Sequence, residues 1–170
     1  MQEPPIDGAS KVIDAYGCFP TFHDGEILDL QLNRNSTPIE AYPTVTIMFT
    51  LHGWEMTSDV TPTGHYRLTK HHLIKFRFDH IDAVDLRYFN HQNVISELAI
   101  ERIDPPTDHA LIRVEFGSCF GLEGGFRAIS GSVVEVIPCD EDANPTTNIG
   151  EQGEAGQPPL AALSATSPVS

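Results

Sequence analysis

The stretch VTIMFTL, residues 45–51, shows the pattern that decides the fold of this chain. Every second residue in it is Val, Ile, Phe or Leu, and threonine or methionine stands between them. Side chains alternate between the two faces of a strand, so this pattern gives one buried and one solvated face. The same period of two recurs at residues 28–32, 73–78, 84–88, 94–103 and 112–116, and in GSVVEVIPC at 131–139. Such runs are typical of antiparallel strands.

The segments between these runs are short and contain strand-breaking residues. They read NRNSTP, PTG, NHQN, DPPTD and GLEGG, and proline, glycine and asparagine in such clusters indicate turns. A parallel crossover needs about a dozen or more non-strand residues, so no parallel connection is expected. The only wide connection, WEMTSDVTPTGHYRL at 54–68, is predicted to be a loop or a short hairpin because it contains proline and glycine.

One helix is predicted near the N-terminus, in IDGASKVIDAY. Asp7 or Ser10 can cap it, and Gly17 can end it. Its apolar residues at helical spacing are Val12, Ile13 and Tyr16. The predicted fold is therefore mainly β, of the α+β class: a curved antiparallel sheet or sandwich of six to eight strands with one short N-terminal helix.

The composition changes abruptly after Cys139. Residues 140–170 contain no lysine, arginine or aromatic residue and are rich in glycine, proline, serine, threonine and acidic residues. Such a segment buries too little apolar surface to offset the entropy of ordering it. We expect a single globular domain over residues 1–139, followed by a disordered acidic tail over 140–170.

The chain is strongly acidic. It has 24 Asp and Glu against 10 Lys and Arg, which gives a formal net charge of −14. Nucleic acids and anionic membranes would be repelled by such a surface, so neither is expected as a partner. A basic protein partner, a metal ion or simple solubility would each suit it, and charge alone does not choose among these three.

The cysteines and the N-terminus favour the cytoplasm. Cys18, Cys119 and Cys139 are odd in number and form no CxxC pair, which favours free thiols in a reducing compartment. The first residues lack the basic segment and apolar run of a secretory signal. No apolar stretch approaches the roughly 20 residues that span a bilayer.

The segment FHDGE combines three chemically versatile side chains, His23, Asp24 and Glu26. If Glu26 opens a strand, the period of two places the carboxylates of Asp24 and Glu26 on the same face as Leu28, Leu30 and Leu32. This leucine run is expected in the core. The side chain of His23 would then point away from both carboxylates. The carboxylates at this rim can form an acid/base pair, or Asp24 can bond the backbone of a turn around the glycine. The turn is the favoured interpretation, because no further catalytic partner is visible.

Other motifs for metal binding or nucleophilic catalysis are weak. His71 and His72 are adjacent and would face opposite sides of a strand, and the chain has no HxH or HExxH pattern. In GSCFG, Ser118 directly follows a glycine, which does not fit the GxSxG nucleophile. The glycines that follow indicate a hairpin, and Cys119 is expected to be a small core residue. We therefore predict no metal, no cofactor and no catalytic residue.

Acidic side chains are spread along the edges and turns of the predicted strands. The default explanation is a solvated surface. A docking surface for a cationic partner is the sharper alternative, because opposite fields accelerate association and add specificity. The residues are Asp79, Asp82, Asp85, Glu97, Glu101, Asp104 and Asp108.

Three stretches of the chain carry a family resemblance. They are FPTFHDGEILDLQLNR, LIKFRFDHIDAVDLRYFNHQNVISELAIERI and ALIRVEFGSCFGLEGGFRAISGSVVEV. They resemble the immunity protein 50 family of bacterial polymorphic toxin systems. In that family an aromatic-Pro-x-Phe-His-Asp-x-Glu opening leads into the first long strand, an FN-x-QNVI turn follows, and a glycine-rich hairpin closes the domain. The likeness runs from about residue 16 to residue 138.

The resemblance implies a binding protein rather than an enzyme, one that neutralises a cognate toxin made beside it by direct association. It implies no catalytic residue. Asp24 and Glu26 fall on the acidic opening of the family, and Asn90 and Asn93 fall on its asparagine turn. Asparagine tolerates left-handed backbone and bonds locally, so a structural role is expected for the matching residues.

Charge and resemblance together predict a cytoplasmic immunity protein that neutralises a basic toxin through an acidic β-surface. The candidate toxin-binding residues are Asp24, Glu26, Asp79, Asp82 and Asp85. Two alternatives remain. One is a small metal-dependent or acid/base hydrolase centred on His23, Asp24 and Glu26, and the other is an oligomerising accessory domain without a toxin partner.

Overall fold

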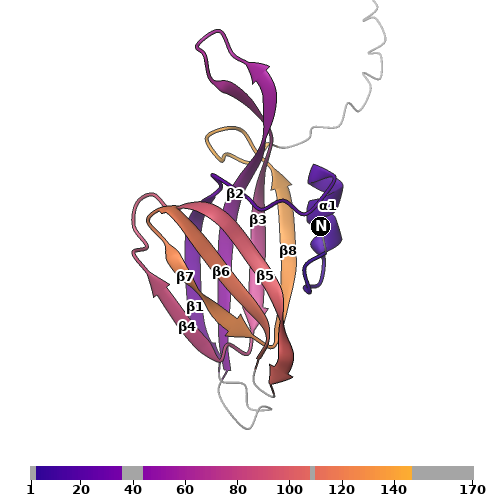
Figure 1. The fold of residues 1–170 in the computed structure, drawn as a ribbon, viewed down its shortest axis with the longest axis vertical. Coiled ribbons are helices and arrows are strands. Elements are labelled where there is room, and N and C mark those ends of the chain that lie inside the picture. The colour runs from indigo at the N-terminus through magenta and orange to yellow at the C-terminus, as the bar shows by residue number, and fades with distance from the viewer. Residues whose placement is uncertain (1–2, 36–43, 108–109, 147–170) are drawn as a thin grey trace, which may run out of the picture.

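The computed structural model describes residues 3–35, 44–107 and 110–146 of the chain (Figure 1). It contains one helix, α1 (Ala9–Tyr16), and eight strands. The strands are β1 (Glu26–Asn35), β2 (Thr44–Val60), β3 (Tyr66–Asp79), β4 (Ala83–Arg87), β5 (Val94–Thr107), β6 (Ala110–Phe120), β7 (Glu123–Ala128) and β8 (Ser130–Pro138). The predicted class, mainly β with one short helix, is confirmed. No helix in the described ranges has the length and apolar character needed to cross a membrane.

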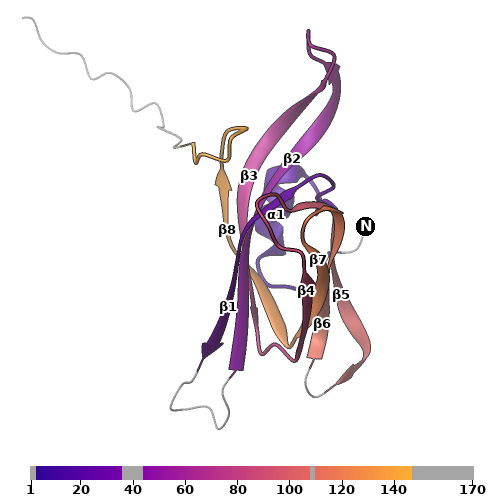
Figure 2. The ribbon, with the colours of Figure 1, turned by 90° about the vertical axis from the view of Figure 1, so that its left-hand side faces the viewer.

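All eight strands pair antiparallel in one sheet, in the order β4-β7-β6-β5-β1-β2-β3-β8. Between its two halves, β1 and β5 share only one ladder pair, Glu26 with Val94. Because this junction is so narrow, the sheet folds over on itself and its halves face each other (Figure 2). The sheet is curved and unclosed, with β4 and β8 as its edges.

The core lies between the two halves and is rich in aromatic rings. Phe49 of β2 meets Phe116 of β6 with ring centroids 5.1 Å apart, and Phe78 of β3 meets Phe126 of β7 at 5.1 Å. Both pairs are edge-to-face, the arrangement that aromatic quadrupoles favour. The alternation predicted for β2 and β3 is confirmed by the fully buried side chains of Ile47, Phe49, Leu51, Ile74, Phe76 and Phe78.

The alternation predicted for β1 is wrong. Leu28 and Leu32 are 41% and 52% exposed, and of the predicted core run only Leu30 packs against the core. The register shifts between Ile27 and Asp29, where a β-bulge adds one residue to β1. The bulge makes Ile27, which is fully buried, the inward residue and leaves Leu28 facing solvent.

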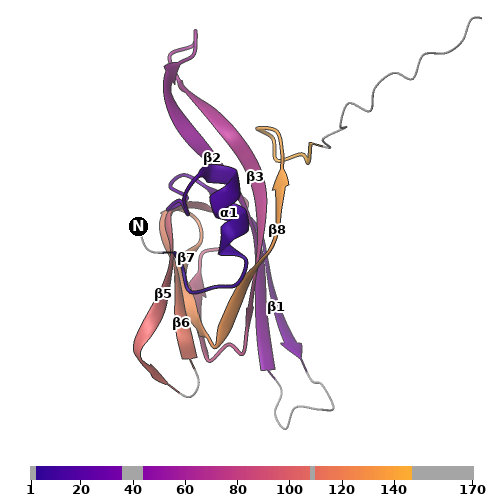
Figure 3. The same ribbon diagram turned by 90° about the vertical axis from the view of Figure 1, so that its right-hand side faces the viewer.

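The helix α1 lies across the open side of the folded sheet, against β8 and β3 (Figure 3). Val12 and Tyr16 are buried, as their spacing predicted. The predicted cap at Asp7 or Ser10 is wrong: the N-cap is Gly8, with φ 70° and no side-chain cap bond. The backbone of Asp7 is instead paired with β8, which fixes the entry of the chain into the helix. Gly17, in the left-handed conformation, ends the helix as predicted.

The wide connection between β2 and β3 is a long hairpin rather than a loop or a short hairpin. Cross-strand pairs run outward from the sheet to Met56 with Leu68 and Val60 with Tyr66. The proline and glycine that indicated a loop are confined to the turn at 61–65. Figure 1 shows that this hairpin extends beyond the rest of the sheet.

The segment after Cys139 is described as far as residue 146. Asp140 accepts hydrogen bonds from the backbone and side chain of Asn144, and Cys139 forms an isolated bridge with Pro145. The described start of the predicted tail is therefore a hydrogen-bonded turn. The remainder, 147–170, lies outside the described residues.

Candidate functional site

The junction between the two halves of the sheet brings together the FHDGE and FNHQNVI segments. The backbone N–H of Asp24 donates to the carbonyl of Ile95, whose own N–H donates to Gly25, each at 2.9 Å. A third bond of 2.9 Å runs from the N–H of Ile27 to the carbonyl of Asn93. Asp24 has φ 65°, so the chain turns sharply before β1 begins. The two segments thus form the seam at which the sheet folds.

Asn93 ties this seam to two neighbouring segments and is only 3% exposed. Its Oδ1 accepts hydrogen bonds from the backbone N–H groups of Asn90, at 2.9 Å, and Leu122, at 3.3 Å. Its Nδ2 donates to the carbonyls of Asn90, at 2.8 Å, and Ile27, at 3.4 Å. One side chain therefore connects the turn after β4, strand β1 and the β6–β7 turn, which is the structural role expected of an asparagine in this turn.

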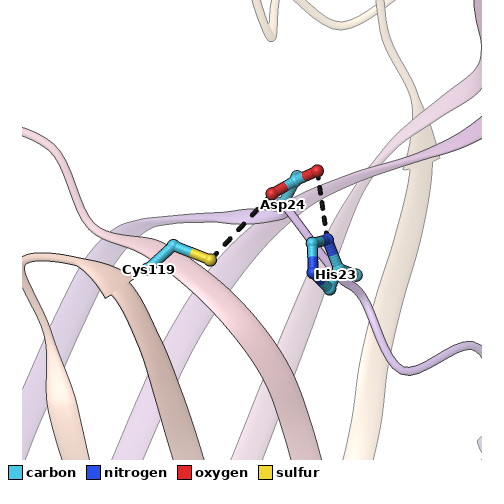
Figure 4. Close-up of side chains that lie close together, drawn as sticks. All are labelled: His23, Asp24 and Cys119. Carbon is cyan, nitrogen blue, oxygen red and sulfur yellow. Dashed lines mark hydrogen bonds and ion pairs between the residues drawn. The ribbon is translucent and has the colours of Figure 1, made fainter.

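Three polar side chains meet at the surface beside this seam (Figure 4). His23 Nδ1 lies 3.0 Å from Asp24 Oδ2, and Cys119 Sγ lies 4.0 Å from Asp24 Oδ1. The expectation that His23 points away from Asp24 is wrong, because both residues stand in a turn and not in a strand. Cys119 was expected in the core and is exposed, near the end of β6.

The order of these contacts decides which chemistry they support. A nucleophilic cysteine needs an imidazole beside its thiol to accept the proton. Here the Asp24 carboxylate lies between the thiol of Cys119 and the ring of His23. Glu26 is not part of the cluster and lies opposite His52 on β2. The three side chains on which the hydrolase alternative depends are not assembled into one centre.

Exposed aromatic rings lie beside the same seam. Tyr88 and Phe89 follow β4, Phe120 ends β6, and they are 69%, 46% and 50% exposed. The ring of His91 lies against Phe120, with centroids 6.3 Å apart. The sequence missed this group because the period of two placed Tyr88 within a strand, whereas it stands beyond β4 with φ 60°. We call this surface the motif end; it comprises His23, Asp24, Tyr88, Phe89, Cys119 and Phe120.

A second exposed apolar surface follows one face of the projecting hairpin. Residues directly opposite each other in an antiparallel pair share a face, as do residues two apart in one strand. Met56, Val60, Tyr66 and Leu68 therefore form one stripe, and they are between 38% and 61% exposed. The hairpin that carries this stripe projects from the end of the sheet at which β1 begins (Figure 1).

Three of the five candidate toxin-binding acids have arginine partners. The ion pairs are Arg77–Asp79 at 2.9 Å, Arg127–Asp82 at 2.7 Å and Arg87–Asp85 at 2.8 Å. Burial acts to raise the pKa of Asp79, but hydrogen bonds from Arg77 and Thr46 outweigh it and hold that pKa below its usual value. In the described part of the chain, neither Asp24 nor Glu26 has an arginine or lysine partner.

The five candidates do not form one patch. Glu26 lies opposite His52 on β2, whereas Asp79 accepts a hydrogen bond from Thr46, six residues earlier in that strand. At about 3.3 Å per residue, the two positions are about 20 Å apart. Asp24 and Glu26 thus lie at one end of the sheet, Asp79 and Asp82 at the other, and Asp85 on β4. Of the other acids noted in the sequence, Asp108 lies outside the described residues.

A pair of histidines, one buried and one half-buried, lies on β2 and β3. Nε2 of His52 is 3.2 Å from Nδ1 of His71, and His52 is 4% exposed. Burial, and then the nearby His71, lower the pKa of His52, while Asp140 acts in the opposite direction. His72 faces the other side and packs on Tyr16, with ring centroids 5.2 Å apart. The prediction that the adjacent histidines face opposite ways is confirmed.

The family comparison covers the region that contains all these features. The model of the family described as immunity protein 50 matches residues 8–136 of the chain. This chain belongs to the immunity protein 50 family. The match includes α1, the seam, the motif end and all five candidate acids, and it ends within β8. A search of curated proteins and a search of solved structures each found no match. The structure thus shows how an immunity protein 50 sequence forms a folded-over sheet.

Proposed function

We propose that this chain neutralises a cognate bacterial toxin by binding it directly. Membership of an immunity protein family supports a toxin partner in general. The observation that carries the proposal is the motif end, where the exposed rings of Tyr88, Phe89 and Phe120 precede the two turns that Asn93 binds to the seam. Protein interfaces are enriched in aromatic anchors, and charges around them set association rate and partner choice.

The seam supports this assignment because it makes the motif end rigid. Asn93 bonds both the turn that follows Tyr88 and Phe89 and the turn that follows Phe120. A surface that is already ordered loses little conformational entropy on binding, which improves affinity. The apolar stripe of the projecting hairpin extends the same docking surface in our proposal.

The acidic residues have two roles in the proposed complex. Asp24 and Glu26, without arginine partners among the described residues, contact a basic surface of the toxin. Asp79, Asp82 and Asp85 are offset locally by arginines and act through the long-range field of a chain with net charge −14. The proposal places the complex in the bacterial cytoplasm, without nucleic acid or membrane.

Co-expression with the toxin domain encoded beside this chain tests the proposal. The chain is expected to co-purify with that domain and to restore growth of cells that produce it. A toxin domain from an unrelated system is the control and should be neither bound nor neutralised. Continued killing, together with no detectable complex between the purified proteins, would reject the proposed function.

A further inference from the structure

The exposed cluster of His23, Asp24 and Cys119 has a donor set with a specific chemical preference. It offers an imidazole nitrogen, a carboxylate oxygen and a thiol sulfur, all within 4.8 Å of one another. These are the donors that Zn²⁺ takes in proteins. Mg²⁺ and Ca²⁺ prefer oxygen ligands alone, so the thiol and the imidazole disfavour both of them.

The spacing of the donors is close to what one ion requires. Tetrahedral zinc has bonds of about 2.0–2.3 Å, which place neighbouring donor atoms about 3.3–3.7 Å apart. The distance from His23 Nδ1 to Asp24 Oδ2 is 3.0 Å, and that from Cys119 Sγ to Asp24 Oδ1 is 4.0 Å. The two oxygens of Asp24 each face one of the other donors (Figure 4). All three donor atoms lie within 4.8 Å of one another, so we expect rotation of these exposed side chains to bring them around one ion.

The backbone that carries these donors is fixed by the seam. Asp24 and Cys119 are 95 residues apart in sequence. Strand β5 holds them together, since Ile95 accepts the N–H of Asp24 and pairs with Ser118 of β6. A site whose supporting backbone is already in place needs little reorganisation to bind an ion.

Fold stability does not account for this cluster. The side chains of His23 and Asp24 are 65% and 41% exposed, and an ion pair so exposed contributes about 0–1 kcal/mol. Across the described ranges, the side chains of His23 and Cys119 have no polar partner other than Asp24. Their exposure also gives an ion direct access.

We propose that His23, Asp24 and Cys119 bind one Zn²⁺ ion through the imidazole, the carboxylate and the thiolate. Coordination releases the thiol proton of Cys119 to solvent and changes no oxidation state. Three protein ligands leave a fourth position open, which water fills in the isolated chain. The site faces the surface beside Phe120, so a donor from a partner protein can replace that water. Metal binding is a property of the chain alone and does not depend on the proposed toxin.

Titration with Co²⁺ tests the site, because a cobalt–thiolate bond gives a charge-transfer absorption that water or carboxylate ligands do not. The full chain, stripped of metal by a chelator and kept reduced by a thiol-free reductant, is expected to show this band at one equivalent. Addition of Zn²⁺ should remove it. Asp24→Asn and His23→Gln should each weaken Co²⁺ binding by more than about tenfold, the loss that even outer-shell changes can cause.

The second exposed cysteine provides a matched control. Cys119→Ser should abolish the charge-transfer band, whereas Cys18→Ser should leave it unchanged. Thermal unfolding of the metal-free Cys119→Ser chain should match that of the unaltered chain, which shows that the variant folds. Absence of the band, its persistence in Cys119→Ser, or its loss in Cys18→Ser would overturn the proposal. Equal metal uptake by every variant would also overturn it, because it would mean non-specific binding to the acidic surface.

Discussion

Aspartate residues have different surroundings at the two ends of the folded sheet. At one end, Asp79 and Asp82 are held by Arg77 and Arg127. At the motif end, Asp24 has no arginine partner in the described part of the chain, and the aromatic rings of this end are exposed. Net charge determines the long-range field, but local pairing determines which carboxylates are available to a partner. The paired acids of the first end contribute to stability, whereas the proposed role of the second end is recognition of the toxin.

The largest change in the free energy of unfolding is expected from a substitution in the seam beneath the motif end. Asn93→Ala leaves the part-buried N–H of Asn90, the buried N–H of Leu122 and the carbonyl of Ile27 without their side-chain partner. We expect a loss of about 3 kcal/mol in the free energy of unfolding, measured in urea. Asn90→Ala is the control: its exposed side-chain bonds to Tyr88 and Gln92 should be worth about 1 kcal/mol or less. A smaller effect at Asn93 than at Asn90 would contradict the role of the seam.

The carboxylates of the two ends are expected to contribute differently to the free energy of unfolding. Asp79→Asn weakens the bonds to Arg77 and Thr46 and should cost about 1 kcal/mol at neutral pH, whereas Asp24→Asn should cost less than about 0.5 kcal/mol. The folded-state pKa of Asp79 is lowered. The stability that Asp79 contributes is therefore fully present above its unfolded-state pKa of about 3.9. It disappears as the pH falls through the pKa of Asp79 in the folded chain. Urea unfolding at neutral and acidic pH measures both effects, and equal costs at the two sites would break the comparison.

The free energy of unfolding is also expected to depend on the protonation of His52, which lies opposite Glu26. Its pKa is lowered in the folded state, so the unfolded chain takes up the proton first. Stability is then full above about pH 6.5 and falls as the pH drops towards the folded pKa, by at most about 1.4 kcal/mol per unit for one group. His52→Gln should flatten this dependence in urea unfolding between neutral and mildly acidic pH. His65→Gln, at the exposed hairpin turn, should leave it intact, and equal slopes in both variants would remove His52 as the cause.

The sequence predicted the positions of most strands correctly, but it did not predict which side chains meet at the surface. Strict alternation in β2 and β3 located the buried face correctly, because a period of two follows from strand geometry alone. The bulge that exposes Leu28 left no such signal, since Leu28, Leu30 and Leu32 alternate without interruption. The contact of Asp24 with Cys119 depends on how the sheet folds at its seam, which periodicity does not describe.

One part of the surface could have been read from the sequence. Arg77 and Asp79 stand two residues apart, as do Asp85 and Arg87, and residues two apart in a strand share a face. Both ion pairs were thus implied by the spacing of the strands already predicted. The pair of Asp82 with Arg127 required the register between distant segments, which the sequence alone did not supply.

The most direct test of the central claim compares the two ends in their affinity for the toxin domain encoded beside this chain. Calorimetric titration should show a loss of about 30-fold or more for Phe120→Ala, as expected when a buried aromatic anchor is removed. In the metal-free chain, Asp24→Asn should lower affinity mainly by slowing association, and should reduce the salt dependence of binding. The matched changes at the other end, Leu32→Ala and Asp82→Asn, should alter affinity by less than about threefold. Larger losses at Leu32 and Asp82 than at Phe120 and Asp24 would contradict the account.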